Sequence, residues 1–160
     1  MAKSKAKAAG GAIELLKEDH AKVQKAFKEF EKMDREDIAT LQQMVQTVCE
    51  ELKIHTTLEE EIFYPAVRDA IDDEDIMNEA AVEHETAKML IDQLENMGPD
   101  DPNYTATFTV LGEYVQHHIK EEEGEMFPEA KKSDLDMEEL GQRMKQRKEE
   151  LMGKMEQEEA

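Results

Sequence analysis

Four of the five histidines in this chain fall into two copies of one pattern. Each copy has a lone His on one predicted helix and, on the next, a His followed four residues later by a Glu and then by an aromatic–Pro pair. The repeated residues are His20, His55 and Glu59 in the first copy and His84, His118 and Glu122 in the second. Imidazoles and carboxylates repeated in this way are the donors that a site for two metal ions inside a helical bundle needs.

The spacing of each His-x-x-x-Glu pair places both side chains on one face of a helix, about 6 Å apart along its axis. A carboxylate on the inward face of a bundle is costly unless it is paired or binds a metal, and no Lys or Arg occupies the matching positions. Four imidazoles and two carboxylates suit iron or manganese better than zinc, and the carboxylates can bridge ions roughly 3.5 to 4 Å apart. We therefore predict a two-metal site; the alternative is a bundle in which these side chains hydrogen-bond only to each other.

The acidic residues beside the two predicted ligand carboxylates are interpreted as a solvated helix face, with Glu123 kept as an alternative ligand. They are Glu60, Glu61, Glu121 and Glu123. His117 is turned about 100° from His118 on a helix, so it is predicted to be exposed or to contact a ligand. Tyr114, one turn before His118, is predicted to be a core aromatic, with a place in the pocket wall as the alternative.

Three further groups of side chains are expected to be structural. Cys49 is interpreted as a buried apolar residue, with a regulatory thiol as the alternative. Lys88 is predicted to be a surface lysine, with contact to a bound anion as the alternative. The residues around the two aromatic–Pro pairs are predicted to pack the end of the bundle; they are Phe63, Tyr64, Met126 and Phe127.

Apolar residues recur every three or four positions through four segments, which indicates amphipathic helices that face a common core. The segments are 13–30, 41–66, 77–94 and 104–122, and the predicted ligands lie on their apolar faces. Short polar connections make successive helices antiparallel. The sequence therefore predicts an all-α, up-down-up-down four-helix bundle with a pseudo-twofold internal repeat and an extra C-terminal helix.

The predicted domain organisation is a flexible basic tail at 1–11, the bundle at 12–132 and a C-terminal helix at 133–160. The C-terminal helix is expected to lie on the bundle or to make a dimer contact, and no chemistry is assigned to it. Pro65 and Pro128 each lack a backbone N–H, so they are predicted to kink or end their helices at equivalent places after the paired His.

The composition narrows the possible partners. At 160 residues the chain is one domain, and 40 acidic against 20 basic residues give a formal charge of -20. This charge repels phosphate backbones and anionic membranes, so no nucleic acid and no membrane partner is expected. The single cysteine excludes a disulfide within the monomer, and no apolar run suits a signal peptide or a membrane span. We expect a cytoplasmic monomer or homodimer.

The order of the donors, His, His-x-x-x-Glu, His, His-x-x-x-Glu, resembles that of the hemerythrin-like, HHE cation-binding family over roughly residues 13–130. The resemblance implies a four-helix bundle that holds two Fe ions in a non-haem di-iron site with an oxo or hydroxo bridge. It assigns the metal-ligand role to the six repeated residues. Members of this family bind dioxygen, sense oxygen or redox state, handle peroxide or nitric oxide, or exchange iron.

The resemblance implies a protein that binds dioxygen, peroxide or nitric oxide in sensing or stress response, with a di-iron peroxidase, catalase-like or oxidase enzyme as the alternative. The oxygen carriers of the family have a fifth His, four residues from the other His of the third helix. Here Ala80 and Lys88 flank His84 at that spacing, which disfavours reversible oxygen carriage. Donation of iron for iron–sulfur repair is less expected, because relatives with that role often carry a cysteine-bearing N-terminal region that is absent here.

Overall fold

The computed structural model describes residues 11–159, and its regular structure is helical, which confirms the predicted all-α class. The helices are α2 (Ala12–Lys32), α3 (Ile38–Leu58), the π-helical η1 (Glu59–Phe63), α4 (Tyr64–Ala70), α5 (Glu74–Glu95), α6 (Tyr104–Glu121), the π-helical η2 (Glu122–Met126), α7 (Phe127–Lys132) and α8 (Met137–Glu159). The tail predicted at 1–11 lies outside the described residues except for Gly11. Within residues 11–159, no helix is both long and apolar enough to cross a membrane.

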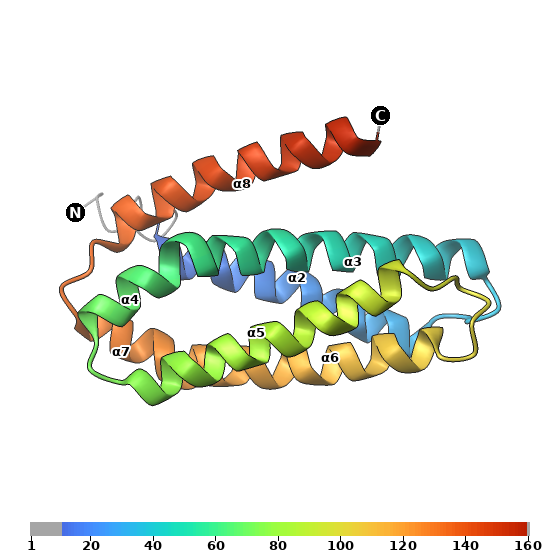
Figure 1. The fold of residues 1–160 in the computed structure, drawn as a ribbon, viewed down its shortest axis with the longest axis horizontal. Helices are drawn as coiled ribbons and strands as arrows, with labels where there is room; N and C mark the ends of the chain where they lie inside the picture. The colour runs from blue at the N-terminus through green and yellow to red at the C-terminus, as the bar shows by residue number, and fades with distance from the viewer. Residues whose placement is uncertain (1–10, 160) are drawn as a thin grey trace.

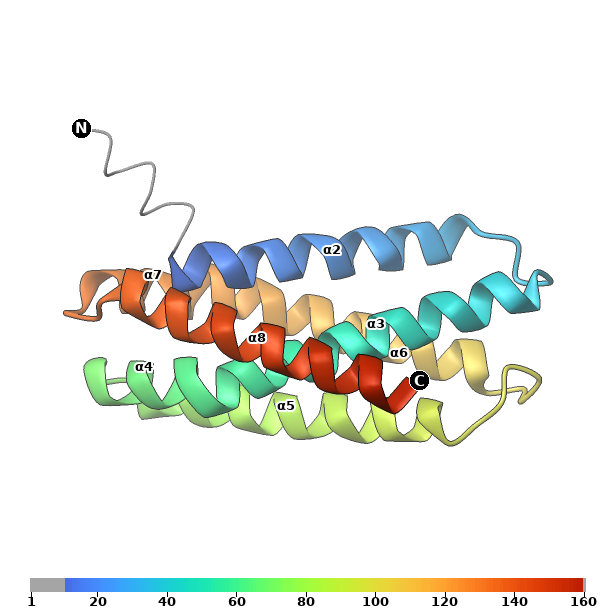
Figure 2. The same ribbon diagram turned by 90° about the horizontal axis from the view of Figure 1, so that it is seen from above.

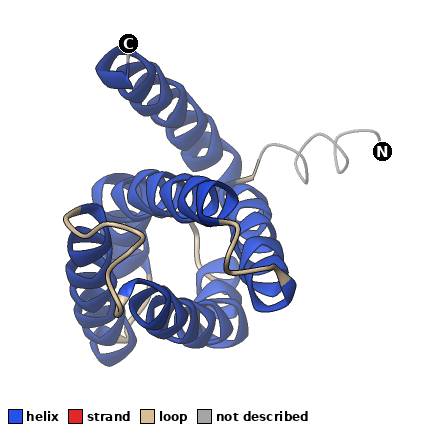
Figure 3. Ribbon diagram, turned by 90° about the vertical axis from the view of Figure 1, so that its right-hand side faces the viewer, coloured by secondary structure: helices blue, strands red, loops and turns tan. Residues whose placement is uncertain are grey.

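The helices α2, α3, α5 and α6 lie side by side, and each runs back along the one before it (Figure 1, Figure 2). Seen end-on, these helices surround a common centre, while the helix that carries the C-terminus lies outside them (Figure 3). The neighbours in this ring are in contact, because α2 packs against α3 and α6, and α5 packs against the same two helices. Residues far apart in the sequence therefore face one interior.

Acidic residues begin two of the helices. The carboxylates of Asp37 and Asp73 cap α3 and α5 by accepting hydrogen bonds from the backbone N–H groups of Thr40 and Ile76. Glu74 in the first turn of α5 adds a favourable interaction with the helix dipole. These caps define where α3 and α5 start. They thereby help to set the positions of His55 and His84 along the bundle axis.

Of the two outcomes predicted for the aromatic–Pro pairs, a kink or an end, the structure excludes an end, because the helical path continues beyond each pair. Each helix passes through a π-helical turn, η1 or η2, and continues into α4 or α7, with Pro65 or Pro128 in the first turn, where its missing N–H is not needed. In η1 the N–H of Tyr64 bonds to the carbonyl of Glu59, five residues earlier. Tyr64 therefore lies one turn beyond Glu59 on the same, inward face.

The core consists of two apolar clusters with a polar layer between them. One cluster packs Phe27, Phe30 and Phe108 among aliphatic side chains of α2, α3, α5 and α6. The other contains Phe63 and Phe127 and lies toward the π-helical turns. Along each long helix, the predicted ligands occur between members of the two clusters, so the ligands form the polar layer that crosses the bundle.

The C-terminal helix α8 lies on the bundle, against α2, α3 and η1 (Figure 2). Leu140 and Met144 in its first half are buried in the second apolar cluster, and Leu151 and Met155 further along pack against it. The apolar side chains of α8 therefore face the bundle. Of the two roles that the sequence left open, packing on the bundle is the one that the structure shows.

Close packing of α2 on α6 requires a glycine at position 112. A Cβ there would lie 2.8 Å from Cδ1 and 3.0 Å from Cε1 of Phe27, whose ring is buried against Phe108. We expect Gly112→Ala to lower the free energy of unfolding by about 1–3 kcal/mol, measured by urea titration. Gly153→Ala in α8 is the control, because its Cβ meets nothing within 4 Å. Equal stability of the two variants would contradict this role of Gly112.

Candidate metal centre

The six predicted ligands come from different helices and converge in the polar layer. Donor atoms of one group lie within 4.8 Å of one another, and the same holds for a second group. The groups are His20, His55, Glu59, Glu122 and Glu59, His84, His118, Glu122. Both carboxylates belong to both groups and are almost fully buried, at 0% exposure for Glu59 and 1% for Glu122. The structure thus brings together every residue that the repeated pattern singled out.

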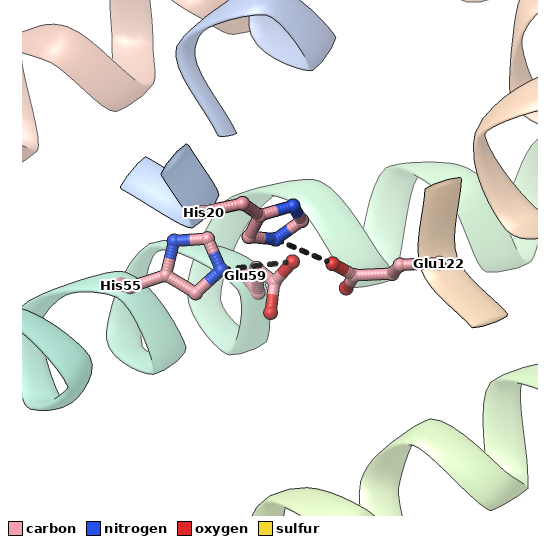
Figure 4. A group of neighbouring side chains, drawn as sticks. All are labelled: His20, His55, Glu59 and Glu122. Atoms are coloured by element: carbon pink, nitrogen blue, oxygen red, sulfur yellow. Dashed lines mark ion pairs between the residues drawn. The ribbon is translucent and has the colours of Figure 1, made fainter. Parts of the chain in front are cut away.

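The first group leaves four buried polar atoms without a hydrogen-bond partner among the described residues: His20 Nε2, His55 Nε2, Glu59 Oε2 and Glu122 Oε1. His20 Nε2 lies 3.1 Å from Glu122 and His55 Nε2 lies 3.5 Å from Glu59, with both rings turned toward the carboxylates (Figure 4). Buried polar atoms in proteins are nearly always hydrogen-bonded, and four that lie close together without hydrogen-bond geometry are costly. Two imidazole nitrogens and two carboxylate oxygens around one point fit a metal cation.

Tyr64, a side chain that the sequence did not assign to the site, lies beside the second group. Its hydroxyl lies 3.2 Å from His84 Nε2 and 3.1 Å from His118 Nε2, and it donates a hydrogen bond to Glu122. The ring of Tyr64 is buried and packs at the end of the bundle, as predicted. In addition, the π-helical turn brings its hydroxyl inward to the site. Its counterpart in the repeat is Phe127, so the two groups differ by one hydroxyl.

Each site imidazole is held at its Nδ1 atom by a further acidic side chain. The pairs are Glu123–His20 at 2.7 Å, Asp19–His55 at 3.0 Å, Glu60–His84 at 2.8 Å and Glu83–His118 at 2.6 Å. A carboxylate at Nδ1 keeps the proton on that nitrogen and leaves the Nε2 lone pair free for a metal. The interpretation of Glu60 and Glu123 as part of a solvated face is therefore wrong, and Glu123 supports a histidine from the side away from the shared carboxylates.

The sequence contained a weak signal for these partners. Asp19 and Glu83 directly precede the two lone histidines, and Glu60 and Glu123 directly follow the two ligand carboxylates, so all four occupy repeated positions. The signal is weak because 40 of the 160 residues are acidic. Each of these carboxylates also reaches a histidine on another helix, and sequence spacing does not show which helices face each other.

Two of the four outer carboxylates are themselves bound by lysines. Lys148 of α8 lies 2.7 Å from Asp19, and Lys88 of α5 lies 2.7 Å from Glu60. Lys88 is partly exposed and pairs with Glu60, in agreement with a surface lysine. Helix α8 was not expected to contribute chemistry, yet Lys148 connects it through Asp19 to a site histidine.

The buried charges of the site stabilise one another. Burial raises the pKa of the Glu59 carboxyl, but the charge of His55 and several hydrogen bonds outweigh burial and hold this pKa well below its usual range. Burial lowers the pKa of His55 and His118, but the nearby carboxylates of Glu59 and Glu122 outweigh it and raise these pKa values to about 10 and about 12. Burial and the same two carboxylates raise the pKa of Tyr64 well above its usual range, so the phenol is neutral at pH 7.

We expect metal binding at pH 7 to release about two protons per chain, because His55 and His118 must lose theirs to bind a cation. The raised pKa values stabilise the metal-free fold fully below pH 6.5, the usual His value, and this contribution is lost as the pH rises through about 10. Metal affinity should therefore increase over the same range. Calorimetric titration with Mn²⁺ in buffers of different protonation enthalpy measures the released protons, and a heat independent of the buffer would contradict the expectation.

Three other side chains singled out in the sequence lie outside the two groups. His117 is exposed and lies 3.3 Å from Glu121. Tyr114 is not a core aromatic, because it is 46% exposed, but it lines a cavity beside the site. Cys49 is buried, as predicted; burial and then the charge of Glu95 raise the pKa of its thiol to about 12. A thiol with this pKa is protonated and unreactive at neutral pH.

A cavity of about 30 Å³ lies beside the site. The four site histidines line it, whereas the two shared carboxylates do not, and its other walls include Val23, Leu52, Ala87, Val115 and Ile119. One water molecule needs about 10–15 Å³ of such volume, so the cavity accommodates a molecule of about two heavy atoms. Its apolar walls favour a small uncharged molecule.

Comparison with known proteins places the chain in a family. The Hemerythrin HHE cation binding domain matches residues 11–130. A crystal structure of a Hemerythrin HHE cation binding domain-containing protein from Mycobacterium kansasii has the same fold, with a TM-score of 0.76, 24% identity and coverage of 90% of this chain and 88% of that one. A DNA nickase from Nostoc sp. is 27% identical to this chain over 114 residues. The matched segment is 71% of this chain but only 32% of the nickase. Because the family match covers most of the sequence, this chain belongs to the hemerythrin HHE cation-binding domain family.

Proposed function

We propose that the chain binds two non-haem iron ions in this site and, at these ions, dioxygen, peroxide or nitric oxide. The imidazole Nε2 atoms and the two shared carboxylates would hold the ions, with His20 and His55 at one position and His84 and His118 at the other. The observation that carries the proposal is the convergence of these donors in a buried layer, where four polar atoms have no hydrogen-bond partner among the described residues.

The types of donor atom in the site are compatible with iron. Imidazole and carboxylate ligands without a thiolate suit iron or manganese, and the Nδ1 carboxylates orient the imidazoles and increase their basicity. Two similar groups that share two carboxylates suit two ions bridged by those carboxylates. Their similarity supports a pseudo-twofold repeat, in which α2 and α3 correspond to α5 and α6. We take the bundle at 12–132 as the metal-binding domain and 133–160 as a helix that supports it.

The cavity supports small ligands. Bound iron would supply redox chemistry and coordination positions that a small molecule can occupy. The volume of about 30 Å³ restricts the ligand to about two heavy atoms, which matches dioxygen, peroxide and nitric oxide. Val23 and Val115 in the wall disfavour water and ions, and Tyr114, which is partly exposed, lies where the cavity approaches the solvent.

A second candidate function is an enzyme that turns over peroxide or dioxygen, and the position of Tyr64 favours it. The Tyr64 hydroxyl lies within hydrogen-bond distance of two site histidines and Glu122. Its high pKa keeps the phenol protonated at neutral pH, so it can donate a hydrogen bond to a ligand in the second group. A hydrogen-bond donor aimed at a ligand stabilises the negative charge that develops on it during turnover.

Nicking of DNA does not enter the proposal. The relative with this activity is about three times as long as the matched segment, so the activity belongs to a protein that has much more than this domain. The formal charge of -20 also opposes binding to a phosphate backbone. Any function that the relative shares with this chain is therefore expected to lie in cation binding.

Thermal unfolding tests the proposal. Iron bound only to the folded chain at a free concentration 100-fold above Kd adds about 2.7 kcal/mol to the free energy of unfolding. For a domain of this size, that increase corresponds to a rise in Tm of roughly 5–10 °C. We expect this rise on anaerobic addition of Fe²⁺ to the metal-free protein, and its reversal by a chelator. An unchanged Tm in both steps would refute a buried iron site.

A further inference from the structure

A third cluster of metal donors lies on the surface, outside the two buried groups. It consists of Glu83 on α5 and His117 and Glu121 on α6, whose donor atoms lie within 4.8 Å of one another. His117 Nε2 is 3.3 Å from a Glu121 oxygen and 3.6 Å from a Glu83 oxygen. The His117 side chain is 61% exposed, so an ion from solvent can reach this cluster directly.

Glu83 belongs to this cluster and to the support of the buried site at the same time. Its Oε1 atom lies 2.6 Å from Nδ1 of His118, and its Oε2 atom is the one that faces His117. One carboxylate therefore separates the surface cluster from a predicted ligand of the buried site. An ion at the surface cluster would be one side chain away from His118.

A small cavity of about 10 Å³ borders both places. It is lined by Glu83 and Glu121 of the surface cluster and by His118 and Glu122 of the buried site. Its remaining wall is apolar, formed by Ile76, Ala80 and Met126. Oxygen and nitrogen donors of the surface cluster and of the buried site thus face one cavity, which has room for a single ion without its water shell.

Among the described residues, the other half of the bundle has no corresponding cluster. The positions of His117 and Glu121 in the repeat are taken by Ile54 and Leu58, which are both buried. The position of Glu83 is taken by Asp19, whose outer oxygen is bound by Lys148. The surface cluster is therefore not a by-product of the internal repeat.

We propose that Glu83, His117 and Glu121 form a third, weaker site for a divalent cation, which captures the ion from solvent and passes it through the cavity to the buried site. The delivery step rests on the proposed function of the buried site, whereas capture does not. One imidazole and two carboxylates suit Fe²⁺ and Mn²⁺, and the formal charge of -20 attracts cations to the surface. Exchange of ligands along the path replaces water around the ion step by step.

Mn²⁺ titration followed by electron paramagnetic resonance tests capture in the full chain. The background variant Glu59→Ala is used to remove the buried site, and one weak Mn²⁺ site is expected to remain. Adding Glu121→Gln or His117→Asn should abolish this site, while Glu113→Gln, which removes the same charge from an exposed position of α6, should preserve it. Retention of the weak site in the Glu121 and His117 variants, or its absence in Glu59→Ala alone, would overturn the proposal.

Stopped-flow loading with Fe²⁺ tests delivery in the otherwise unmodified chain. Because local charge and donors raise ion association rates by roughly 10-fold or more, Glu121→Gln should slow loading about 10-fold without reducing the final iron content. Glu113→Gln should load at the wild-type rate. Equal rates for all three proteins would refute delivery. Absence of buried iron in the wild type would refute the proposed function instead, and the titration of the Glu59→Ala variant would still decide whether the surface site exists.

Discussion

Replacing Glu59 by Ala is expected to reduce the iron content from about two ions per chain to nearly none. Glu59 is fully buried and supplies a donor to both groups, so its loss affects both ions at once. The measurement is elemental analysis of protein that has been loaded anaerobically with Fe²⁺ and passed through a desalting column. Replacing His55 by Ala removes a donor from one group and is expected to lower the content by about one ion per chain.

Glu61→Ala is the matched control for this experiment. Glu61 lies on the same helical turn and has the same charge, but its side chain is 47% exposed and binds Arg147 of α8. Its iron content should equal that of the wild type. A variant with Ala at His20, His55, His84 and His118 that still carries wild-type iron would show that iron binds elsewhere. Circular dichroism of each variant separates loss of donors from loss of the fold.

The second large effect concerns the reaction with air. We expect the reduced, iron-loaded protein to oxidise rapidly and irreversibly in oxygenated buffer, and the oxidised protein to consume hydrogen peroxide. The reason is the missing fifth histidine. Ala80 is buried in an apolar cluster, and Lys88 extends to Glu60, so neither residue adds a donor beside His84. Two ions held by the six donors would therefore keep coordination positions that the protein does not fill.

Stopped-flow absorbance after mixing with oxygenated buffer, followed by a peroxide assay, measures this reaction. Replacing Tyr64 by Phe should slow peroxide consumption about 100-fold if its hydroxyl donates a hydrogen bond to the reacting ligand, because removing one such donor typically costs this much. Tyr114→Phe removes the hydroxyl of another tyrosine that lines the cavity and should leave the rate unchanged. A spectrum that returns to that of the reduced protein when oxygen is removed, without peroxide consumption, would instead indicate a carrier.

The helical class and the six clustered donors could be predicted from the sequence because both depend on local periodicity. In an α-helix, residues four apart share a face, so His55 with Glu59 and His118 with Glu122 had to point the same way. The apolar residues on either side of each pair indicated that this face is buried. The repeat of the pattern then indicated that the two pairs meet in one interior, and the structure brings them together.

The course of the chain after each pair was not predictable from this periodicity. An α-helical count directs Tyr64 away from Glu59, whereas the π-helical turn of η1 joins residues five apart and places Tyr64 on the inward face. The proline at position 65 was predicted to kink or end its helix, and in the structure it lies in the first turn of α4, where a proline is tolerated. A one-residue change in the helical turn therefore decided whether a hydroxyl enters the site.

The sequence by itself determined which residues could bind a metal; tertiary structure alone decided what surrounds them. Asp19, Glu60, Glu83 and Glu123 each reach a histidine on another helix, and Lys148 of α8 reaches Asp19 beside the site. Such contacts depend on the rotation and level of neighbouring helices, which follow from the packing of the whole core and not from spacing within one helix. Among 40 acidic side chains, only that packing separates the supporting carboxylates from the solvated ones.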